Sequence, residues 1–366
     1  MAKNTRSIDR VSETKGRQPL AFFLLLVAAP VVMAHEFSAS MNHQSSSGLA
    51  YKEHWLDKGL NSNAKTVAAS LHASAGGVAE VGGLELEVAA KYKGYYVGSE
   101  NVLFLAALAE DSNKFAIPKD GHYSLNGELQ MLQSRQVTLG KSVRWGENVR
   151  LHFKPHIFTI ESYQLAKARG GLTVAGQDAK VQGSFDRVGT RRYGYLVNEK
   201  EDHGWGWGLD LAGSYERGPW RLDFKANNLL SQLRFSSVHY SNRVYNVSAV
   251  NGEIEIKRHN NFSMMGEYGY KKSTERLPVQ TEIALSNSNW NYWQAGVYSV
   301  GDRVVPWLAV QYSYGPFHAR ASTMQFQNLS LDFSWLSSKG SGIGLGVTFA
   351  ENGKPRVGQL LARAVW

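Results

Sequence analysis

The sequence of 366 residues predicts an all-β protein, a transmembrane antiparallel β-barrel of roughly 12–14 strands. Three observations carry this prediction. Apolar and polar residues alternate over several runs of about ten residues, the length that a tilted strand needs to cross a bilayer. Aromatic residues stand at the ends of alternating runs, as two membrane–water interfaces would select. After residue 34, no apolar run approaches the length of a transmembrane helix.

A soluble β-sandwich is the alternative, since its strands also alternate. Its strands are usually about 5–6 residues long, and the inward faces of its two sheets form a dry core. The residues on the inward face of the alternating runs are too polar for such a core, because they include Asp, Asn, Gln, Lys and Arg. The membrane barrel is therefore the better interpretation.

Residues 1–34 read as a secretory signal peptide. Five Lys and Arg residues precede an apolar run, Pro19 to Val32, and Val32-Met33-Ala34 offers small or apolar residues at the positions a signal peptidase reads. An uncleaved N-terminal anchor is the alternative. The chain has no Cys, so an exported protein of this size needs a large core or a closed hydrogen-bond network.

Residues 35–80 differ from the rest of the chain. They are rich in Ser, Asn, Ala and Gly and alternate poorly. Two interpretations stay open: an N-terminal plug folded inside the barrel, or a periplasmic tail followed by an early strand. The barrel itself is expected over residues 81–366.

The strands are expected in order along this region. Alternation starts near Leu84 and continues through 84–92, 122–131 and 136–145. The clearest hairpin is GWGWGLDLAGSYERGPWRLDFKANNLL, residues 204–230, with its turn at 216–219. Its predicted interfacial aromatics are Trp205 and Trp207 at one end and Tyr215 and Trp220 at the other. Further strands are expected at 262–270, 279–285, 293–297, 308–314, 329–335, 343–349 and 360–366.

The polar faces of these strands supply charged candidates for the barrel lumen. They are Glu85, Glu87, Lys91, Glu128, Arg144, Asp210, Arg221, Asp223 and Lys225. Such charges either pair across strands or line a pore and set its ion preference. Pairing is favoured for most of them, above all for the four of mixed sign in the 204–230 hairpin.

No arrangement in the sequence predicts an enzyme, a metal site or a cofactor. There is no Gly-x-Ser-x-Gly elbow, no HExxH motif, no phosphate loop and no Cys ligand. His259 lies near Ser263 in the sequence, but such proximity is common by chance and does not indicate a hydrolase. His152 and His156 share one strand face, but no third ligand accompanies them.

The last residues carry a resemblance. Leu360, Ala362, Ala364 and Trp366 alternate and end on an aromatic, which resembles the closing strand of Gram-negative outer-membrane barrels. In that class the final aromatic is part of the signal read by the barrel-assembly machinery, although Phe is commoner there than Trp. The residue pattern of the 204–230 hairpin resembles that of hairpins in fatty-acid-transporter-like barrels and in plasmid-transfer-operon barrels.

The resemblance implies an outer-membrane location. The expected partners are outer-membrane lipid and, during biogenesis, the assembly machinery. Without residues 1–34 the net charge is about +6, a mild and scattered excess, so nucleic acid is not expected. The solute or protein partner stays open.

The leading function is passage of solutes by diffusion through a polar or partly plugged lumen. The alternatives are a non-conducting structural or assembly barrel of an envelope, secretion or conjugative transfer system, and a hydrophobic-ligand transporter. A barrel enzyme acting on lipid or peptide is the third class. An open lumen or a ligand pocket would favour transport, and a tightly filled lumen with a large periplasmic segment would favour a structural role.

Overall fold

The computed structural model describes residues 36–45, 60–103, 119–190, 204–249, 262–287, 293–300, 303–324, 328–338, 340–349 and 355–365. The expected signal peptide and Trp366 lie outside them. The strands are β1 (Glu36–Ser45), β2 (Thr66–Val81), β3 (Leu84–Ser99), β4 (Gly121–Ser124), β5 (Gly127–Trp145), β6 (Val149–Ala175), β7 (Asp178–Gly189), β8 (Gly204–Arg217), β9 (Trp220–Ala249), β10 (Phe262–Glu275), β11 (Gln280–Asn287), β12 (Trp293–Val300), β13 (Arg303–Tyr314), β14 (Phe317–Met324), β15 (Asn328–Leu336), β16 (Gly342–Phe349) and β17 (Pro355–Val365). In this part of the chain, no helix is long and apolar enough to cross a membrane.

Fourteen of these strands close into an antiparallel barrel. Around the ring they follow the order β1, β2, β3, β5, β6, β8, β9 and β11 to β17. The ring closes because β1 pairs with β2 on one side and with β17 on the other, where Glu36 is opposite Val365. The predicted fold class is confirmed, with an even strand number as bacterial barrels have.

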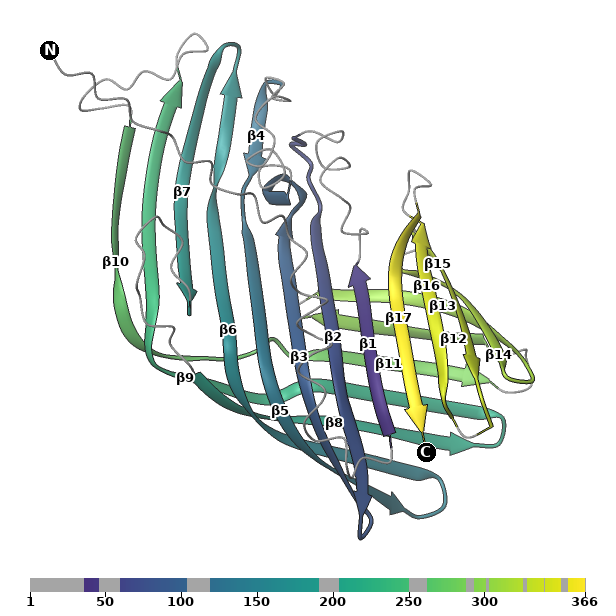
Figure 1. Cartoon of the computed structure of the whole chain (residues 1–366). Helices are drawn as coiled ribbons and strands as arrows, with labels where there is room; N and C mark the ends of the chain where they lie inside the picture. Colours follow the sequence, from purple (N-terminus) through teal and green to yellow (C-terminus); the bar gives the residue numbers. More distant parts are fainter. Residues whose placement is uncertain are drawn as a thin grey trace, which may run out of the picture.

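The three remaining strands extend one side of the barrel. β6 and β9 have 27 and 30 residues, and only their first halves belong to the ring. Their second halves pair with β7, which lies between them, while β4 pairs with β6 and β10 with β9. In Figure 1 this taller sheet rises well above the short strands β11 to β17.

Two interpretations stood open for residues 35–80, and the described part of this segment forms strands. Strand β1 and nearly all of β2 fall in this segment, and both are wall strands of the barrel. The wall therefore begins at Glu36 rather than at residue 81, and these two stretches are not a plug. Alternation was poor because the outer face of β2 carries Ala73, Ala75, Gly77 and Ala79, which contrast little in polarity with the inward Ser74, Gly76 and Val78.

Both ends of the wall lie at the rim that carries short turns. The turns at 82–83, 146–148, 218–219 and 315–316 are here, and the C-terminal end of β17 lies at the same rim (Figure 1). Four tight positions are glycines with positive φ, namely Gly82, Gly146, Gly218 and Gly315. The ends of the wall and the short turns therefore share one side of the barrel.

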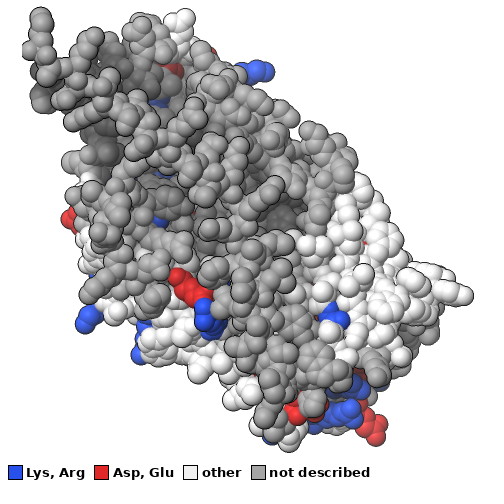
Figure 2. Space-filling model, in the orientation of Figure 1, with Lys and Arg blue, Asp and Glu red and all other residues white. Residues whose placement is uncertain are grey.

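The outer face of the barrel is apolar. Its exposed side chains include Leu84, Leu86, Val88, Val137, Leu139, Phe153, Ile157, Leu222, Ile283, Leu285, Leu308, Val310, Phe333, Ile343 and Leu345. A water-soluble monomer rarely exposes so continuous an apolar surface, whereas a bilayer requires one. In Figure 2 the largest group of Lys, Arg, Asp and Glu lies at the lower end, and the white surface of the right-hand flank shows few of them.

Aromatic side chains border this apolar surface. Beside the short turns stand Trp145, Tyr215, Trp220, Tyr314, Phe317 and Trp335, and the first and fourth of these are 75% exposed. Trp205 and Trp207 mark the other border on β8. There the Arg234 guanidinium lies 5.2 Å from the Trp205 ring, and the Trp207 indole donates to Gln232. All four predicted interfacial aromatics therefore lie on the outer face, near its two edges.

Candidate functional site

The inner face of β8 begins with three glycines because rings from β6 and β9 lie over it. A Cβ on Gly204 would be 2.7 Å from the Phe235 ring, one on Gly206 would be 2.5 Å from Phe158, and one on Gly208 would be 2.4 Å from His156. The sequence GWGWG thus places its tryptophans on the outer face and leaves room inside for side chains that fill the lumen.

A hydrogen bond crosses the lumen between β2 and β12, which are not neighbours in the wall. The Ser70 hydroxyl on β2 lies 2.9 Å from the Tyr298 hydroxyl on β12, and Gln280 on β11 donates to that same tyrosine at 2.6 Å. β2 and β12 stand on opposite sides of the ring. The lumen is therefore bridged at this level.

Asn228 of β9 is the second bridge. Its side-chain oxygen accepts from Lys93 Nζ at 2.8 Å, and its amide nitrogen donates to the Tyr95 hydroxyl at 2.9 Å. Its backbone N–H donates to Asp210 at 2.6 Å. Among the described residues it is the single non-glycine with positive φ, at 54°, a conformation that Asn tolerates better than most residues. It stands in a bulge where β8 and β9 change register.

The four residues that link β10 to β11, 276–279, supply a third bridge. The backbone groups of this link, which lies opposite the bulge, form hydrogen bonds with side chains of other strands. Ser231 accepts from the Leu277 N–H and donates to its carbonyl, Asn228 donates to the Pro278 carbonyl, and Gln130 of β5 donates to the Arg276 carbonyl. Leu277 is 3% exposed and belongs to the main apolar cluster.

These bridging side chains form one layer, here called the septum. It comprises Ser70, Lys93, Tyr95, Gln130, Asn228, Leu277, Gln280 and Tyr298, each at most 7% exposed. The septum is continuous with an apolar cluster that includes Leu132, Phe158, Ile160, Tyr163, Leu233, Phe235, Val300 and Trp307. Polar groups that are fully buried are therefore hydrogen-bonded to one another within an apolar surround.

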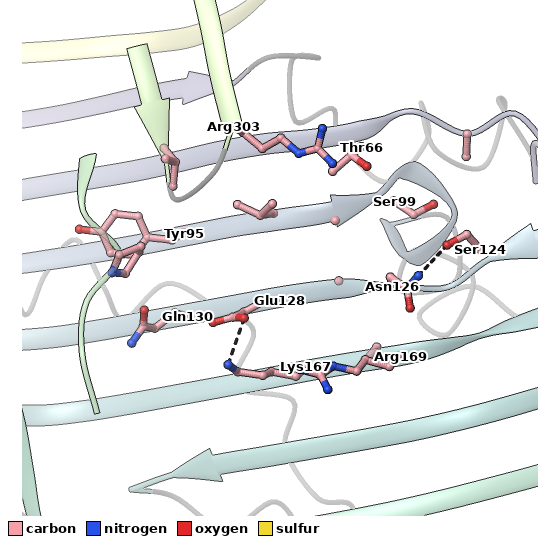
Figure 3. Close-up of a pocket in the computed structure, with 17 residues that line it drawn as sticks. Thr66, Tyr95, Ser99, Ser124, Asn126, Glu128, Gln130, Lys167, Arg169 and Arg303 are labelled. Atoms are coloured by element: carbon pink, nitrogen blue, oxygen red, sulfur yellow. Dashed lines mark hydrogen bonds and ion pairs between the residues drawn. The ribbon is translucent and has the colours of Figure 1, made fainter. Parts of the chain in front are cut away.

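A cavity of about 620 Å³ lies on the side of the septum toward the taller sheet. This outer cavity ends at Tyr95, Gln130 and Pro278, and its wall carries Arg169 and Arg303 (Figure 3). Glu128 and Lys167 also line it and form an ion pair at 3.1 Å.

The space on the other side of the septum is larger and more charged. A cavity of about 670 Å³ is lined by Lys93, Gln280 and Tyr298 of the septum. Two further cavities, of about 300 and 580 Å³, share lining residues with it and extend to the rim with the short turns. We call these three spaces the inner chamber. Among the described residues, none lines both the outer cavity and the inner chamber.

All nine predicted lumen candidates line one of these spaces. Glu128 is in the outer cavity; Glu85, Glu87, Lys91, Arg144, Asp210, Arg221, Asp223 and Lys225 are in the inner chamber. Six of the nine form ion pairs, including Lys91 with Glu87 at 2.8 Å and Glu85 with Lys154 at 2.7 Å.

The expected pairing within the 204–230 hairpin holds only in part. Arg221 pairs with Asp223 at 2.8 Å. Asp210 instead accepts the Asn228 N–H and lies 3.9 Å from His156, and Lys225 has no carboxylate within 4.0 Å in the described part of the chain. The bulge accounts for this difference, since it moves β9 out of the register that a simple hairpin would have.

The other predicted positions can also be placed. Leu360, Ala362 and Ala364 share the outer face of β17, where Ala362 is opposite Ala39 of β1. Trp366 lies outside the described residues, so its role as an assembly signal stays a prediction. His152 and His156 both face the lumen, and His259 lies outside the described residues.

Sequence reasoning missed the septum. Two signals for it were present. ANNLL, residues 226–230, breaks the alternation of the hairpin, and the bulge exposes both Leu229 and Leu230. Pro278 interrupts the run before β11, and proline is rare inside a central strand. Neither signal tells which distant side chains would meet there.

A closed barrel with an apolar belt, aromatic borders and a polar interior defines the chain as an outer-membrane β-barrel protein. No protein-family model and no curated protein matches its sequence. Similar structures include a deletion mutant of TodX, titled a monoaromatic hydrocarbon channel, with 10% identity, a TM-score of 0.43, and coverage of 90% of this chain and 88% of that one. The Pseudomonas putida toluene transporter TodX has 10% identity and a TM-score of 0.42, with 90% and 86% of the two chains covered. Likeness at this level does not extend the solutes of those proteins to this chain.

Proposed function

We propose that the protein is an outer-membrane transporter with a closed septum, through which a solute passes from the outer cavity to the inner chamber. One observation carries this proposal: two cavities of solute size, about 620 and 670 Å³, lie on either side of one bridging layer. Passage is then controlled by the septum, in place of free diffusion through an open polar lumen.

The link at 276–279 is the part of the septum best suited to move. Side chains of Asn228, Ser231 and Gln130 hold it, so it can shift without breaking a ladder of backbone bonds. A net hydrogen bond in a protein contributes about 0.5–1.5 kcal/mol, so a few such bonds are within reach of a solute's binding energy.

Conductance in planar bilayers tests the proposal. The wild-type protein should be closed for most of the time. The double substitution Tyr95→Ala and Leu277→Ala removes two large septum side chains and should give steady ohmic steps. The matched control, Tyr92→Ala with Val279→Ala, changes a tyrosine on the opposite face of β3 and a half-exposed residue of the link, and it should stay closed.

The outcomes separate the candidate functions. Steps from the septum variant alone support a gated transporter. Steady steps from the wild-type protein would favour the open diffusion pore. Silence from all three, with folding and insertion shown by heat-dependent gel mobility, would contradict the proposal and favour a non-conducting structural or assembly barrel.

Transport of a hydrophobic ligand is the second candidate. It is favoured by the apolar side chains around the septum, including Leu132, Phe158, Leu233 and Val300, which give a ligand an apolar path. This candidate predicts that neutral aromatic molecules bind as tightly as charged ones of the same shape.

A further inference from the structure

Lys93 is a buried cation at the centre of the septum. It is 7% exposed, and Asn228 Oδ1 is the one hydrogen-bond acceptor that the described residues give its ammonium group. No carboxylate lies within 4.0 Å of it in this part of the chain; Asp210, which accepts from the Asn228 backbone N–H, attracts it only at longer range. A buried ammonium group with a neutral partner is costly, and such groups in membrane proteins mark functional sites.

The outer cavity has the same excess of positive charge. Its one carboxylate, Glu128, is neutralised by Lys167. Arg169 and Arg303 also line this cavity, and neither has a carboxylate partner in the described part of the chain. In Figure 3 Arg303 reaches from β13 toward Thr66 on β2, across the cavity from Lys167 and Arg169.

The inner chamber continues this pattern to the rim. Arg144 and Arg150 are directly opposite on β5 and β6, and both line the chamber. Like charges in that position repel, and neither arginine has an ion-pair partner among the described residues. Lys225 is also without an ion pair. The chamber carboxylates that lack a Lys or Arg within 4.0 Å are Asp210 and Glu282.

We propose that the solute carries an oxyanion, such as a carboxylate, sulfonate or phosphate, and that Lys93 receives this group as it crosses the septum. The inference rests on the proposed transport function and names its substrate class. Arg169 and Arg303 attract the anion into the outer cavity, Lys93 replaces its weak neutral partner with the anion, and Arg144, Arg150 and Lys225 draw it toward the rim.

Binding to the intact protein is the first test, because it does not need the septum to open. Benzoate and benzamide are planar probes of nearly equal shape that differ in charge. By calorimetry in detergent, benzoate should bind at least about tenfold more tightly than benzamide. Lys93→Met should abolish this difference, whereas Lys141→Met, on the outer face of β5, should preserve it.

Lys93→Met removes a costly buried charge but leaves Asn228 Oδ1 without its donor, so the urea midpoint of this variant is measured to show that it is folded. Arg169→Gln with Arg303→Gln is a second variant on the cavity wall, and it should weaken benzoate binding without affecting benzamide. Three results would overturn the inference: equal binding of the two probes, no binding of either probe, or tight benzoate binding by folded Lys93→Met.

Ion selectivity is the second readout. In the septum variant with Tyr95→Ala and Leu277→Ala, the reversal potential in a salt gradient should show anion preference, and adding Lys93→Met should reduce it. Cation preference would overturn the inference while leaving transport intact. Benzoate binding through Lys93 together with a silent septum variant would overturn the proposed transport function and leave an anion site.

Discussion

At the scale of the residue, Asn228 connects the wall strand β9 to the other side chains of the septum. Its φ of 54° is part of the bulge in β9, and the same bulge turns its side chain toward Lys93, Tyr95 and Pro278. An amide suits this place because it both accepts and donates. An aspartate here could accept from Lys93, but it would have no N–H to donate to the Tyr95 hydroxyl or to the Pro278 carbonyl.

Two substitutions at Asn228 separate backbone strain from side-chain bonding. Asn228→Gly and Asn228→Ala both remove the side-chain hydrogen bonds, at a cost of about 1–3 kcal/mol. Only alanine also has a Cβ that disfavours positive φ, so Asn228→Ala should unfold with a free energy about 1–2 kcal/mol lower than Asn228→Gly. Urea unfolding in lipid vesicles, followed by tryptophan fluorescence, measures this difference. Equal stability of the two variants would contradict the assigned backbone conformation.

At the scale of the element, the period of two was sufficient to assign the faces of the long strands. It placed Leu84 and Leu86 outside, Glu85 and Glu87 inside, and the tryptophans of GWGWG on the outer face. It failed for β2, whose outer face is made of small residues with little contrast in polarity. It also could not show that β7 and β10 leave the ring, because strands of the extension alternate like strands of the wall.

The septum was beyond the reach of such patterns for a different reason. Ser70 and Tyr298 meet across 228 positions of the chain, and Lys93 and Asn228 across 135. Each is an ordinary inward polar residue on its own strand. Their meeting depends on barrel closure, on the bulge and on the inward path of 276–279, none of which is a local property. The charged lumen could thus be predicted residue by residue, whereas the layer that closes it could not.

The glycines of β8 give a prediction at this scale. Gly206→Ala should lower the free energy of unfolding by about 1–3 kcal/mol, because its Cβ would meet the Phe158 ring at 2.5 Å and the Gln232 carbonyl at 2.8 Å. Combining it with Phe158→Leu should recover part of the loss, as a double-mutant cycle would show. Gly94→Ala is the matched control, since its Cβ would have neighbours no closer than 3.6 Å. A loss as large at Gly94 would refute the packing explanation.

At the scale of the whole molecule, one seam turns a sheet of wall strands into a barrel. Seven residue pairs join β1 to β17, and the Arg363 guanidinium forms an ion pair with Glu36 at 2.6 Å across the seam. The septum depends on this closure, because side chains of β2 and β12 can meet only when the wall curves back on itself. An open seam would expose unpaired strand edges and separate the two sides of the septum.

Cross-linking tests the seam directly, and the absence of native Cys removes any background. Ala39 and Ala362 are opposite each other in the pairing of β1 with β17, at a spacing in antiparallel sheets that a disulfide can span. Ala39→Cys with Ala362→Cys should therefore oxidise readily and hold the barrel in its compact form on a heated gel until reductant is added. Ala39→Cys with Ala364→Cys is offset by two residues and should cross-link far more slowly. Equal rates for the two pairs would mean that the register is wrong, and failure of both would mean that the barrel is open at this seam.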